Sequence, residues 1–278
     1  MVFKIGAHVS IAGGFPKALK REKELGGNCG QIFVKSPRGW SFPDLDEKEA
    51  KEFKVMYTEG NIQPIVVHGT YLINLATPKD ELFKKSIECL RGELVRANRL
   101  GLPYVIFHPG SHTGFGEENG LSRIIKGLNA LTETLTDIET ELLLENTAGE
   151  GTSLGYTMEQ LQRMMEGAAS EKVKVCFDTA HAFGAGYAVH TKEGIEKVVK
   201  EIEATICLDA LKIVHLNDSK AELGSRKDEH HHLGKGKMGR TGIKNFINHK
   251  AFRDLPMIRE SPVSPHDIKV AKELRVKS

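Results

Sequence analysis

The chain has 278 residues, and 40% of them are hydrophobic, which is enough to build the core of one large domain. It carries 39 basic and 37 acidic residues, and the net charge of +2 neither requires nor excludes a nucleic-acid partner. The apolar runs are only about five residues long, which excludes a membrane-spanning helix. The N-terminal stretch MVFKIGAHVS lacks the layout of a signal peptide, so we expect a cytoplasmic protein.

Eight short apolar runs rich in β-forming residues follow one another along the chain, with helical patterns between them. The runs are 2–9, 29–34, 63–69, 103–110, 141–147, 173–179, 211–218 and 255–261. Continuous apolar strands that alternate with helices are typical of parallel strands buried on both faces. Eight such units predict a single closed (β/α)8 barrel, a TIM barrel, over residues 1–278. An open, doubly wound sheet is the alternative.

The clearest helical pattern covers 81–101. Its apolar residues recur at steps of three and four, at Phe83, Ile87, Leu90, Leu94 and Ala97, and Gly101 stands where the helix should stop. The segments 121–135 and 194–205 show similar patterns. The four cysteines, Cys29, Cys89, Cys176 and Cys207, are far apart and form no CxxC pair, so we expect reduced, buried thiols.

Histidines and carboxylates stand at the ends of six consecutive strand runs. They are His68, His108, Glu145, Asp178, His215 and Glu260, and His181 follows three residues after Asp178. Each one alone is better explained as a core histidine, a helix-start acid, a turn former or a loop charge than as a ligand. In a closed barrel, however, the carboxyl ends of the strands converge on one mouth. Burying all these groups there costs several kcal/mol per unpaired charge, roughly, unless a cation compensates. Because these side chains suit borderline divalent cations, the pattern predicts a Zn²⁺ site.

Two further histidines, His8 in GAHVS and His112 in PGSH, follow strand runs one and four. We expect them to orient a ligand rather than to bind the metal themselves.

The stretch DEHHHLGKGKMG, residues 228 to 239, lies in a long polar segment after the seventh strand run. An extended backbone puts residues 228, 230 and 232 on one side. We therefore expect Asp228 and His230 to bind one metal, with His181 as a candidate third ligand, and His231 to face away. Strand parity alone leaves His232 open as a further candidate.

The glycines of this stretch, Gly234, Gly236 and Gly239, match a dinucleotide fingerprint in letters only, because a polar loop precedes them instead of a strand. We expect their backbone N–H groups, beside Lys235 and Lys237, to suit a phosphodiester instead.

Several motifs, in this order, resemble endonuclease IV, the zinc-dependent apurinic/apyrimidinic endonuclease family, over nearly the whole chain. They are GAHVSIAGG, YLINL, FHPGSH, ENTAGEG, FDTAHAFGAGY, HLNDSK, DEHHHLGKGKMG and the later RES. The resemblance implies a TIM barrel with three zinc ions. It assigns His68, His108 and Glu145 to the first zinc, Glu145, Asp178, His215 and Glu260 to the second, and His181, Asp228 and His230 to the third. Only the resemblance excludes His232.

The resemblance also implies the reaction. The substrate is double-stranded DNA with an abasic site, cut on the 5′ side to leave a 3′-OH and a 5′-deoxyribose phosphate. Glu145 is the catalytic residue that bridges two zincs holding the hydroxide, while the third zinc neutralises the leaving oxygen. Arg38 and Tyr71 fill the gap in the base stack, and Trp40 is equally explained by loop packing or DNA contact. We expect a monomer with no membrane partner.

This chain departs from the family pattern at Gly69-Thr70, at Glu229, often a basic residue, and at Arg259, commonly an apolar one. None of the three departures removes a ligand. Two other classes compete with the endonuclease interpretation. A sugar isomerase of the xylose-isomerase type shares the barrel and a two-metal site, but it does not need the His-rich third site. A DNA-binding barrel without catalysis has no reason to keep nine ligand-type residues.

Overall fold

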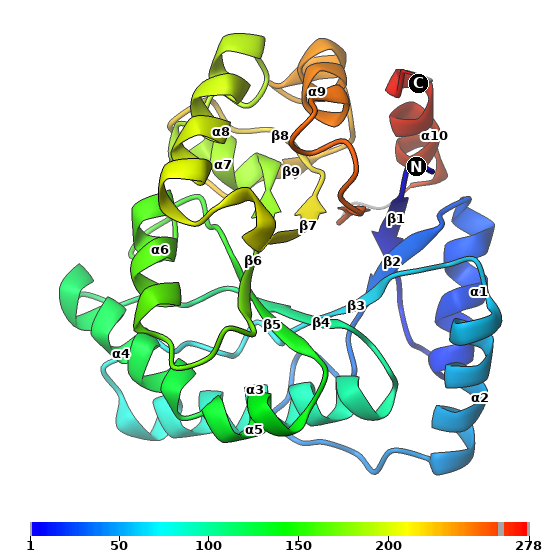
Figure 1. Cartoon of the computed structure of the whole chain (residues 1–278), viewed down its shortest axis with the longest axis vertical. Helices are drawn as coiled ribbons and strands as arrows, with labels where there is room; N and C mark the ends of the chain where they lie inside the picture. The colour runs from blue at the N-terminus through cyan, green and yellow to red at the C-terminus, as the bar shows by residue number, and fades with distance from the viewer. Residues whose placement is uncertain (1, 261–263, 277–278) are drawn as a thin grey trace.

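The computed structural model describes residues 2–260 and 264–276, and its centre is a closed barrel of eight parallel strands (Figure 1). Around the barrel the order is β1, β10, β7, β6, β5, β4, β3, β2. The bounds are β1 Ile5–His8, β2 Cys29–Ile32, β3 Ile65–His68, β4 Tyr104–Phe107, β5 Glu141–Glu145, β6 Val173–Asp178, β7 Leu211–His215 and β10 Met257–Arg259. The predicted TIM barrel is confirmed, and the open sheet is excluded because β1 pairs with both β2 and β10.

All eight predicted strand runs contain a barrel strand, although each strand is shorter than its run. Helices lie outside the strands (Figure 1). Their bounds are α1 Phe15–Leu25, α2 Glu47–Glu59, α3 Asp80–Arg99, α4 Glu117–Asn129, α5 Thr132–Asp137, α6 Met158–Gly167, α7 Thr179–Ala185, α8 Lys192–Thr205, α9 Gly239–Asn248 and α10 Pro265–Leu274. A 3-10 turn, Leu208–Ala210, precedes β7.

The helix predicted from 81–101 is α3, and its periodic apolar residues are buried as expected. The segment 121–135 is helical as predicted apart from a short break, because it contains most of α4 and the start of α5. The break falls at Ala130 and Leu131. Leu131 is fully buried, so the periodic spacing of apolar residues continues through the break. Apolar spacing alone therefore cannot reveal where the helix is interrupted.

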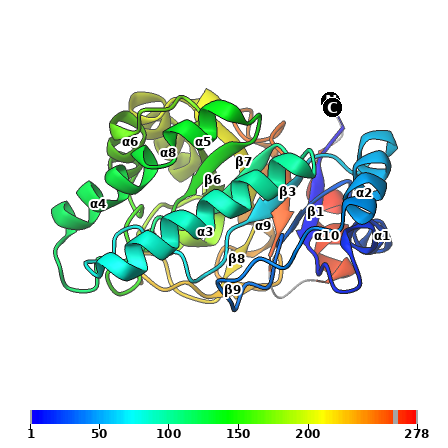
Figure 2. The same ribbon diagram turned by 90° about the horizontal axis from the view of Figure 1, so that it is seen from below.

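The long polar segment after β7 contains a small hairpin. Strands β8, Asp218–Ser219, and β9, His230–His231, pair antiparallel, so that Asp218 faces His231 and Ser219 faces His230. Figure 2, the view from below, shows this hairpin at the lower end of the barrel. The segment therefore carries its own hydrogen-bonded structure at one end of the barrel.

A layer of side chains fills the barrel interior. It consists of Cys29, Val66, Ile106, Leu143, Cys176, Ile213 and Ile258, all fully buried. Each of them lies two positions before a polar residue at the end of its strand, and alternate residues of a strand point to the same face. Those polar residues are Gln31, His68, His108, Glu145, Asp178, His215 and Glu260. The apolar layer therefore forms the floor of a polar mouth.

Three cysteines are buried as predicted, but Cys207 is exposed. It lies in the turn between α8 and β7 with a positive φ of 65°, and this turn runs on the surface. Among residues 2–260 and 264–276, no helix is both long and apolar enough to span a bilayer.

Candidate metal centre

Three groups of histidine and carboxylate side chains lie at the carboxyl ends of the strands. The groups are His68, His108 and Glu145; Glu145, Asp178, His215 and Glu260; and Asp178, His181 and His230. Within each group the possible ligand atoms lie within 4.8 Å of one another. Glu145 belongs to the first two groups and Asp178 to the last two, so the three groups form one continuous cluster.

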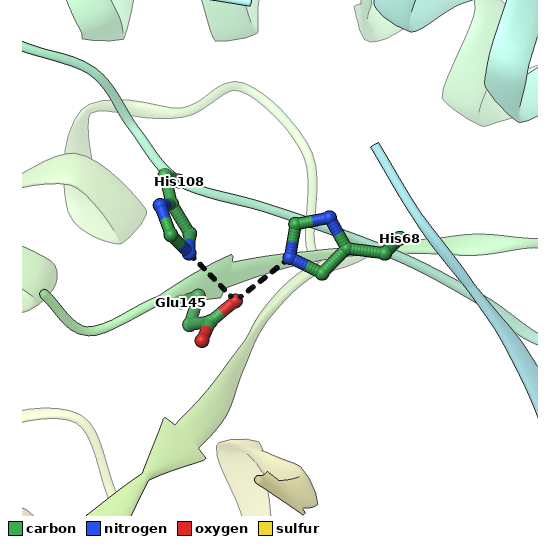
Figure 3. Close-up of side chains that lie close together, drawn as sticks. All are labelled: His68, His108 and Glu145. Atoms are coloured by element: carbon green, nitrogen blue, oxygen red, sulfur yellow. Dashed lines mark ion pairs between the residues drawn. The ribbon is translucent and has the colours of Figure 1, made fainter. Parts of the chain in front are cut away.

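In the first group, Oε2 of Glu145 lies 3.3 Å from Nε2 of His68 and 3.2 Å from Nε2 of His108 (Figure 3). Nδ1 of His68 lies 2.7 Å from the carbonyl oxygen of Gly69, to which it donates. That contact puts the ring proton on Nδ1 and leaves the lone pair of Nε2 toward the carboxylate. Both imidazoles therefore point their Nε2 atoms at the same Glu145 oxygen.

In the second group, Nδ1 of His215 lies 2.8 Å from Oε1 of Glu145 and 3.4 Å from Oε2 of Glu260. On the other side of the ring, Nε2 lies 2.8 Å from Oε1 of Gln31, whose Nε2 donates to Oε1 of Glu260 at 2.9 Å. Because the amide nitrogen is committed to a carboxylate, its oxygen must accept from His215 Nε2–H. Nδ1 of His215 in turn donates to Oε1 of Glu145, and a metal bound among the carboxylates would take the place of that proton.

Asn217 connects two candidate ligands of the second group. Its Nδ2 donates to Oδ2 of Asp178 at 2.6 Å and to Oε2 of Glu260 at 3.2 Å. The prediction from sequence missed both Gln31 and Asn217. Gln31 left a signal, because it is a polar residue in the apolar run 29–34 with the strand-end parity of the other site residues. Asn217 stands in the motif HLNDSK but contributes only hydrogen bonds.

The third group depends on α7, which Asp178 begins. Oδ1 of Asp178 accepts from the N–H of His181 at 2.7 Å and caps the helix, and this cap places the His181 ring above the barrel. Nδ1 of His181 donates to the carbonyl of Asn146 at 2.9 Å, so the free nitrogen is Nε2. That Nε2 and Nε2 of His230 lie 3.1 and 3.2 Å from Oδ1 of Asp228.

Asp178 and Asp228 thus compete for the third group. Asp178 Oδ2 lies 3.8 Å from Nε2 of His230, and Oδ1 is 3.8 Å from Nδ1 of His181, a nitrogen already bonded to a carbonyl. Asp228 instead reaches the free Nε2 of both rings, although its side chain is 39% exposed. We therefore favour Asp228 as the carboxylate of the third group, as the sequence predicted, with Asp178 serving the second.

Several ligand atoms of the cluster are buried without a hydrogen bond. Within the described part of the chain, Oε2 of Glu145, Nε2 of His181 and Nε2 of His230 have no hydrogen-bond partner. Their neighbours are close but outside hydrogen-bond geometry, and a buried polar atom without a partner is destabilising. Lone pairs that converge in this way, from imidazoles and carboxylates, match the donor set of Zn²⁺. The residues present therefore fit a zinc cluster.

The pKa values of the cluster show how strongly its charges interact. Burial by itself lowers the pKa of His181, but Asp178 and Asp228 outweigh burial and raise it well above its ordinary value. Burial raises the pKa of Glu260, but His215 outweighs it and holds the pKa near 2. The neighbouring carboxylates thus favour a proton on His181. A bound cation would compete with that proton, so binding would release protons.

His8 and His112 occupy different environments. Nδ1 of His8 lies 3.0 Å from Nε2 of Gln31, and its ring lies 6.1 Å from that of His68, so it borders the cluster through Gln31. His112 instead accepts a hydrogen bond from the N–H of Gly116 at 3.1 Å, in the loop before α4. The contacts described for His112 include no candidate ligand, so they do not support the predicted orienting role.

A cavity of about 1220 Å³ opens above the cluster. Phe33 and Tyr71 line it together with His68, and Tyr71 is 66% exposed. Arg38 is also exposed, on the loop after β2. Trp40 is half-buried and packs against the hydrophobic core, as the loop-packing interpretation requires. The mouth therefore offers an aromatic side chain close to the candidate ligands.

Gly69 and Thr70 lie directly before Tyr71, and Thr70 connects their loop to the loop that carries Arg38. Oγ1 of Thr70 donates to the carbonyl of Pro37 at 2.5 Å, which ties the loop after β3 to the loop after β2. A side chain at Gly69 would place its Cβ 3.2 Å from Cβ of Phe107, tighter than ordinary contact. Thr70 therefore holds the two loops beside each other, while the tight packing at Gly69 leaves little room for a side chain.

The N–H groups of Gly234 and Gly236 are not available to a phosphodiester, so the prediction was wrong for these two glycines. The N–H groups of Gly234 and Gly236 donate to Oδ2 of Asp218 at 2.9 and 3.0 Å, and Met238 N–H donates to its Oδ1 at 3.0 Å. Asp218 is fully buried. It thus gathers the loop around one carboxylate, while Lys235 and Lys237 remain exposed.

The chain matches, over residues 19–276, the family model described as a xylose isomerase-like TIM barrel. It is 44% identical to a probable endonuclease 4 of Halothermothrix orenii, with 93% of each chain covered, and 42% identical to that of Natronomonas pharaonis, with 98% covered. The crystal structure of endonuclease IV from Thermus thermophilus superposes with a TM-score of 0.86, at 36% identity and 98% coverage of both chains.

More distant structures share the fold alone. A D-tagatose 3-epimerase-like protein superposes with a TM-score of 0.72 at 20% identity, with 98% of this chain and 95% of that chain covered. At this level of identity the likeness shows only that the two proteins share the barrel fold. The full-length matches at 40–45% identity all carry the endonuclease 4 name. The chain is therefore an enzyme, and it belongs to the endonuclease IV family of TIM-barrel proteins.

Proposed function

We propose that the protein hydrolyses the phosphodiester on the 5′ side of abasic sites in double-stranded DNA, leaving a 3′-OH and a 5′-deoxyribose phosphate. The observation that carries the proposal is the convergence of three histidine–carboxylate groups under one open cavity, in a chain of the endonuclease IV family. We infer that the cluster holds three zinc ions, because its donors are those that zinc prefers.

The proposed ligand sets follow the groups described above. The first zinc is held by His68, His108 and Glu145, the second by Glu145, Asp178, His215 and Glu260, and the third by His181, Asp228 and His230. When bound, zinc supplies a water of lowered pKa and positive charge beside the reacting phosphate. Glu145 presents one oxygen to the first group and the other to the second, which suits a bridging carboxylate.

No covalent intermediate is part of this proposal. Cys176, the thiol nearest to the second group in sequence, is fully buried below Asp178, and burial raises its pKa to about 12. A thiol in that state is a poor nucleophile. The protein side chains would therefore hold the zinc ions and orient the reacting groups, and water would be the nucleophile.

Recognition of damage is assigned to the rim of the cavity. Tyr71 lines the cavity, and Arg38 is exposed beside Pro37, which also lines it. These two side chains would fill the gap that an opened abasic site leaves in the stack. Glu229 is exposed and lines the same cavity, so its charge would face the DNA backbone and weaken nonspecific binding.

We further propose that residues 1–278 act as one catalytic domain, since β1 and β10 come from opposite ends of the chain and pair directly. All nine proposed ligands come from one chain, which supports a monomer. The DNA substrate would be met in the cytoplasm, where unpaired thiols stay reduced.

The test combines metal analysis with cleavage of an oligonucleotide that carries a single abasic analogue. The purified protein should contain about three zinc ions per chain. Chelation should abolish cleavage, and added zinc should restore it. Full cleavage by the stripped protein would overturn the metal mechanism. Conversion of a ketose without DNA cleavage would favour the sugar-isomerase alternative.

A further inference from the structure

Arg259 is a fully buried guanidinium in the wall of the barrel, directly before the candidate ligand Glu260. It is the largest of the fully buried side chains in the described structure. Burying a charge is unfavourable unless hydrogen bonds and an opposite charge compensate. Its contacts therefore show what this chain gains from it.

The guanidinium reaches three parts of the mouth. Nη1 donates to Oδ1 of Asn217, the residue whose amide group holds Asp178 and Glu260. Nη2 donates to the carbonyl oxygen of His231 at 2.7 Å, and Nε lies 3.9 Å from Oδ2 of Asp267. One side chain thus joins the second ligand group to the β8–β9 hairpin.

Asp267, at the start of α10, continues the connection. It is fully buried, its Oδ1 accepts from the N–H of Leu233 at 2.8 Å, and its Oδ2 lies 2.8 Å from Nδ1 of His232. Arg259 and Asp267 together therefore contact three successive residues, His231, His232 and Leu233. These follow directly after His230, a proposed ligand of the third zinc.

We propose that Arg259 is a positioning residue that holds the segment 228–233 in its metal-binding position before any metal binds. The third ligand group takes two of its three members from this loop, whereas the first two groups stand on strand ends. Ordering a loop on binding weakens the binding, so a loop held in advance binds more tightly. The planar guanidinium suits this role because its donors point in fixed directions to separate acceptors.

The proposal rests on the proposed function only for the identity of the metal. Its first test uses metal-free protein and needs neither zinc nor DNA. The reporter is the backbone amide of Gly234, which donates to Asp218 and not to Arg259 or Asp267, the two residues that are replaced. In Arg259→Leu, hydrogen exchange at Gly234 should become about tenfold faster or more, because the loop opens locally. Exchange at the β5 amide of Leu144 should stay slow.

Arg275→Leu is the matched control. The Arg275 side chain is 10% exposed and donates to two backbone carbonyls, those of Ile247 and Arg253, but contacts no proposed ligand. The Arg275→Leu variant should have a lower melting temperature than wild type, but hydrogen exchange at the Gly234 amide should not be faster. Equal exchange at Gly234 in both variants would show that Arg259 contributes only general stability, and the proposal would be wrong.

The second test follows the metal. Chelator competition should show that one zinc of three binds about 10- to 100-fold more weakly in Arg259→Leu, as expected for a residue that supports ligands from outside. The first zinc, whose proposed ligands make no described contact with Arg259 or Asn217, should keep its affinity. Uniform loss of all three would contradict a role specific to the loop. If wild-type protein binds no third zinc, the proposed function fails, while the exchange result still decides the role of Arg259.

A double variant separates positioning from simple charge neutralisation, and it also covers the case in which the single variant does not fold. Arg259→Leu with Asp267→Asn removes both buried charges and keeps an acceptor for the N–H of Leu233. It should fold, yet exchange at Gly234 should stay fast, because the donor to the His231 carbonyl is gone. Wild-type protection in the double variant would mean that Arg259 only neutralises Asp267, and it would overturn the proposal.

Discussion

The amide oxygen of Gln31 lies 2.8 Å from Nε2 of His215, while its amide nitrogen lies 2.9 Å from Oε1 of Glu260. One neutral side chain thus orients two proposed ligands of the same zinc. It fixes the tautomer of His215 through an accepted hydrogen bond, and it fixes the rotation of the carboxylate through a donated one.

Replacing Gln31 with Leu should therefore weaken zinc binding at the second group about 10- to 100-fold. The measurement is a zinc titration against a chelator of known affinity. Gln160→Leu is the control, because Gln160 is also buried and accepts from the N–H groups of Gly155 and Tyr156, away from the cluster. An unchanged titration for Gln31→Leu would show that His215 and Glu260 are held without it.

The two neighbouring histidines His230 and His231 should differ sharply. Nε2 of His230 faces Asp228 and His181, whereas Nδ1 of His231 accepts a hydrogen bond from the N–H of His232. His230→Ala should lower the zinc content by one ion and reduce abasic cleavage by orders of magnitude, because the third group loses a donor. His231→Ala should keep all zinc. Comparable zinc losses in both variants would refute the proposed third group.

Tyr71 should contribute to affinity for damaged DNA without affecting the metal. Its ring lies 5.5 Å from that of His68 and 5.6 Å from that of Phe33, with most of its surface exposed. Stacking is worth roughly 1–3 kcal/mol per base, so Tyr71→Ala should weaken binding to abasic duplex about ten- to a hundredfold. Binding to intact duplex should barely change, because that rests on phosphate contacts.

The measurement is a pair of titrations at one salt concentration, with abasic and intact duplex, and Arg38→Ala is tested alongside. Phe115→Ala serves as the control, since Phe115 is also an exposed aromatic side chain, at 47%. Zinc content should stay unchanged in all three variants. Equal losses on both duplexes would mean that Tyr71 and Arg38 make ordinary backbone contacts.

Glu22 in α1 should make stability depend on pH in an unusual direction. It is fully buried, accepts a hydrogen bond from the N–H of Ala7 at 3.0 Å, and burial raises its pKa to about 8. A raised pKa means that the folded state binds the proton more tightly than the unfolded one. Its stability contribution is therefore complete below the unfolded pKa of 4.5 and is lost as pH rises toward 8.

Glu22→Gln removes this titration while keeping the shape. The variant should match wild type near pH 5 and exceed it by a few kcal/mol, roughly, above pH 8, as the size of the pKa shift implies. Denaturant unfolding at both pH values gives the comparison, and taking differences cancels the titration of the metal cluster. A constant difference between the two proteins across this range would show that Glu22 titrates normally.

The sequence alone determined the barrel and most of the proposed centre, because both depend on local periodicity. Strand runs place every second residue on one face, so apolar residues such as Ile213 and Leu143 predict which later residues, His215 and Glu145, point into the mouth. The same parity places Gln31 in the mouth, but a neutral amide is not a typical zinc ligand, so ligand chemistry does not single it out.

Only the tertiary structure decided how the loops are held. The N–H groups of Gly234 and Gly236 looked available in the sequence, but the carboxylate of Asp218 occupies them. The sequence places Arg259 in a strand run directly before Glu260, but only the fold shows that it lies between Asn217 and Asp267, which come from distant parts of the chain. Such contacts depend on which loops the closed barrel brings together. Hydrogen bonds between residues far apart in sequence leave no periodic signal, because only the folded chain sets their distance.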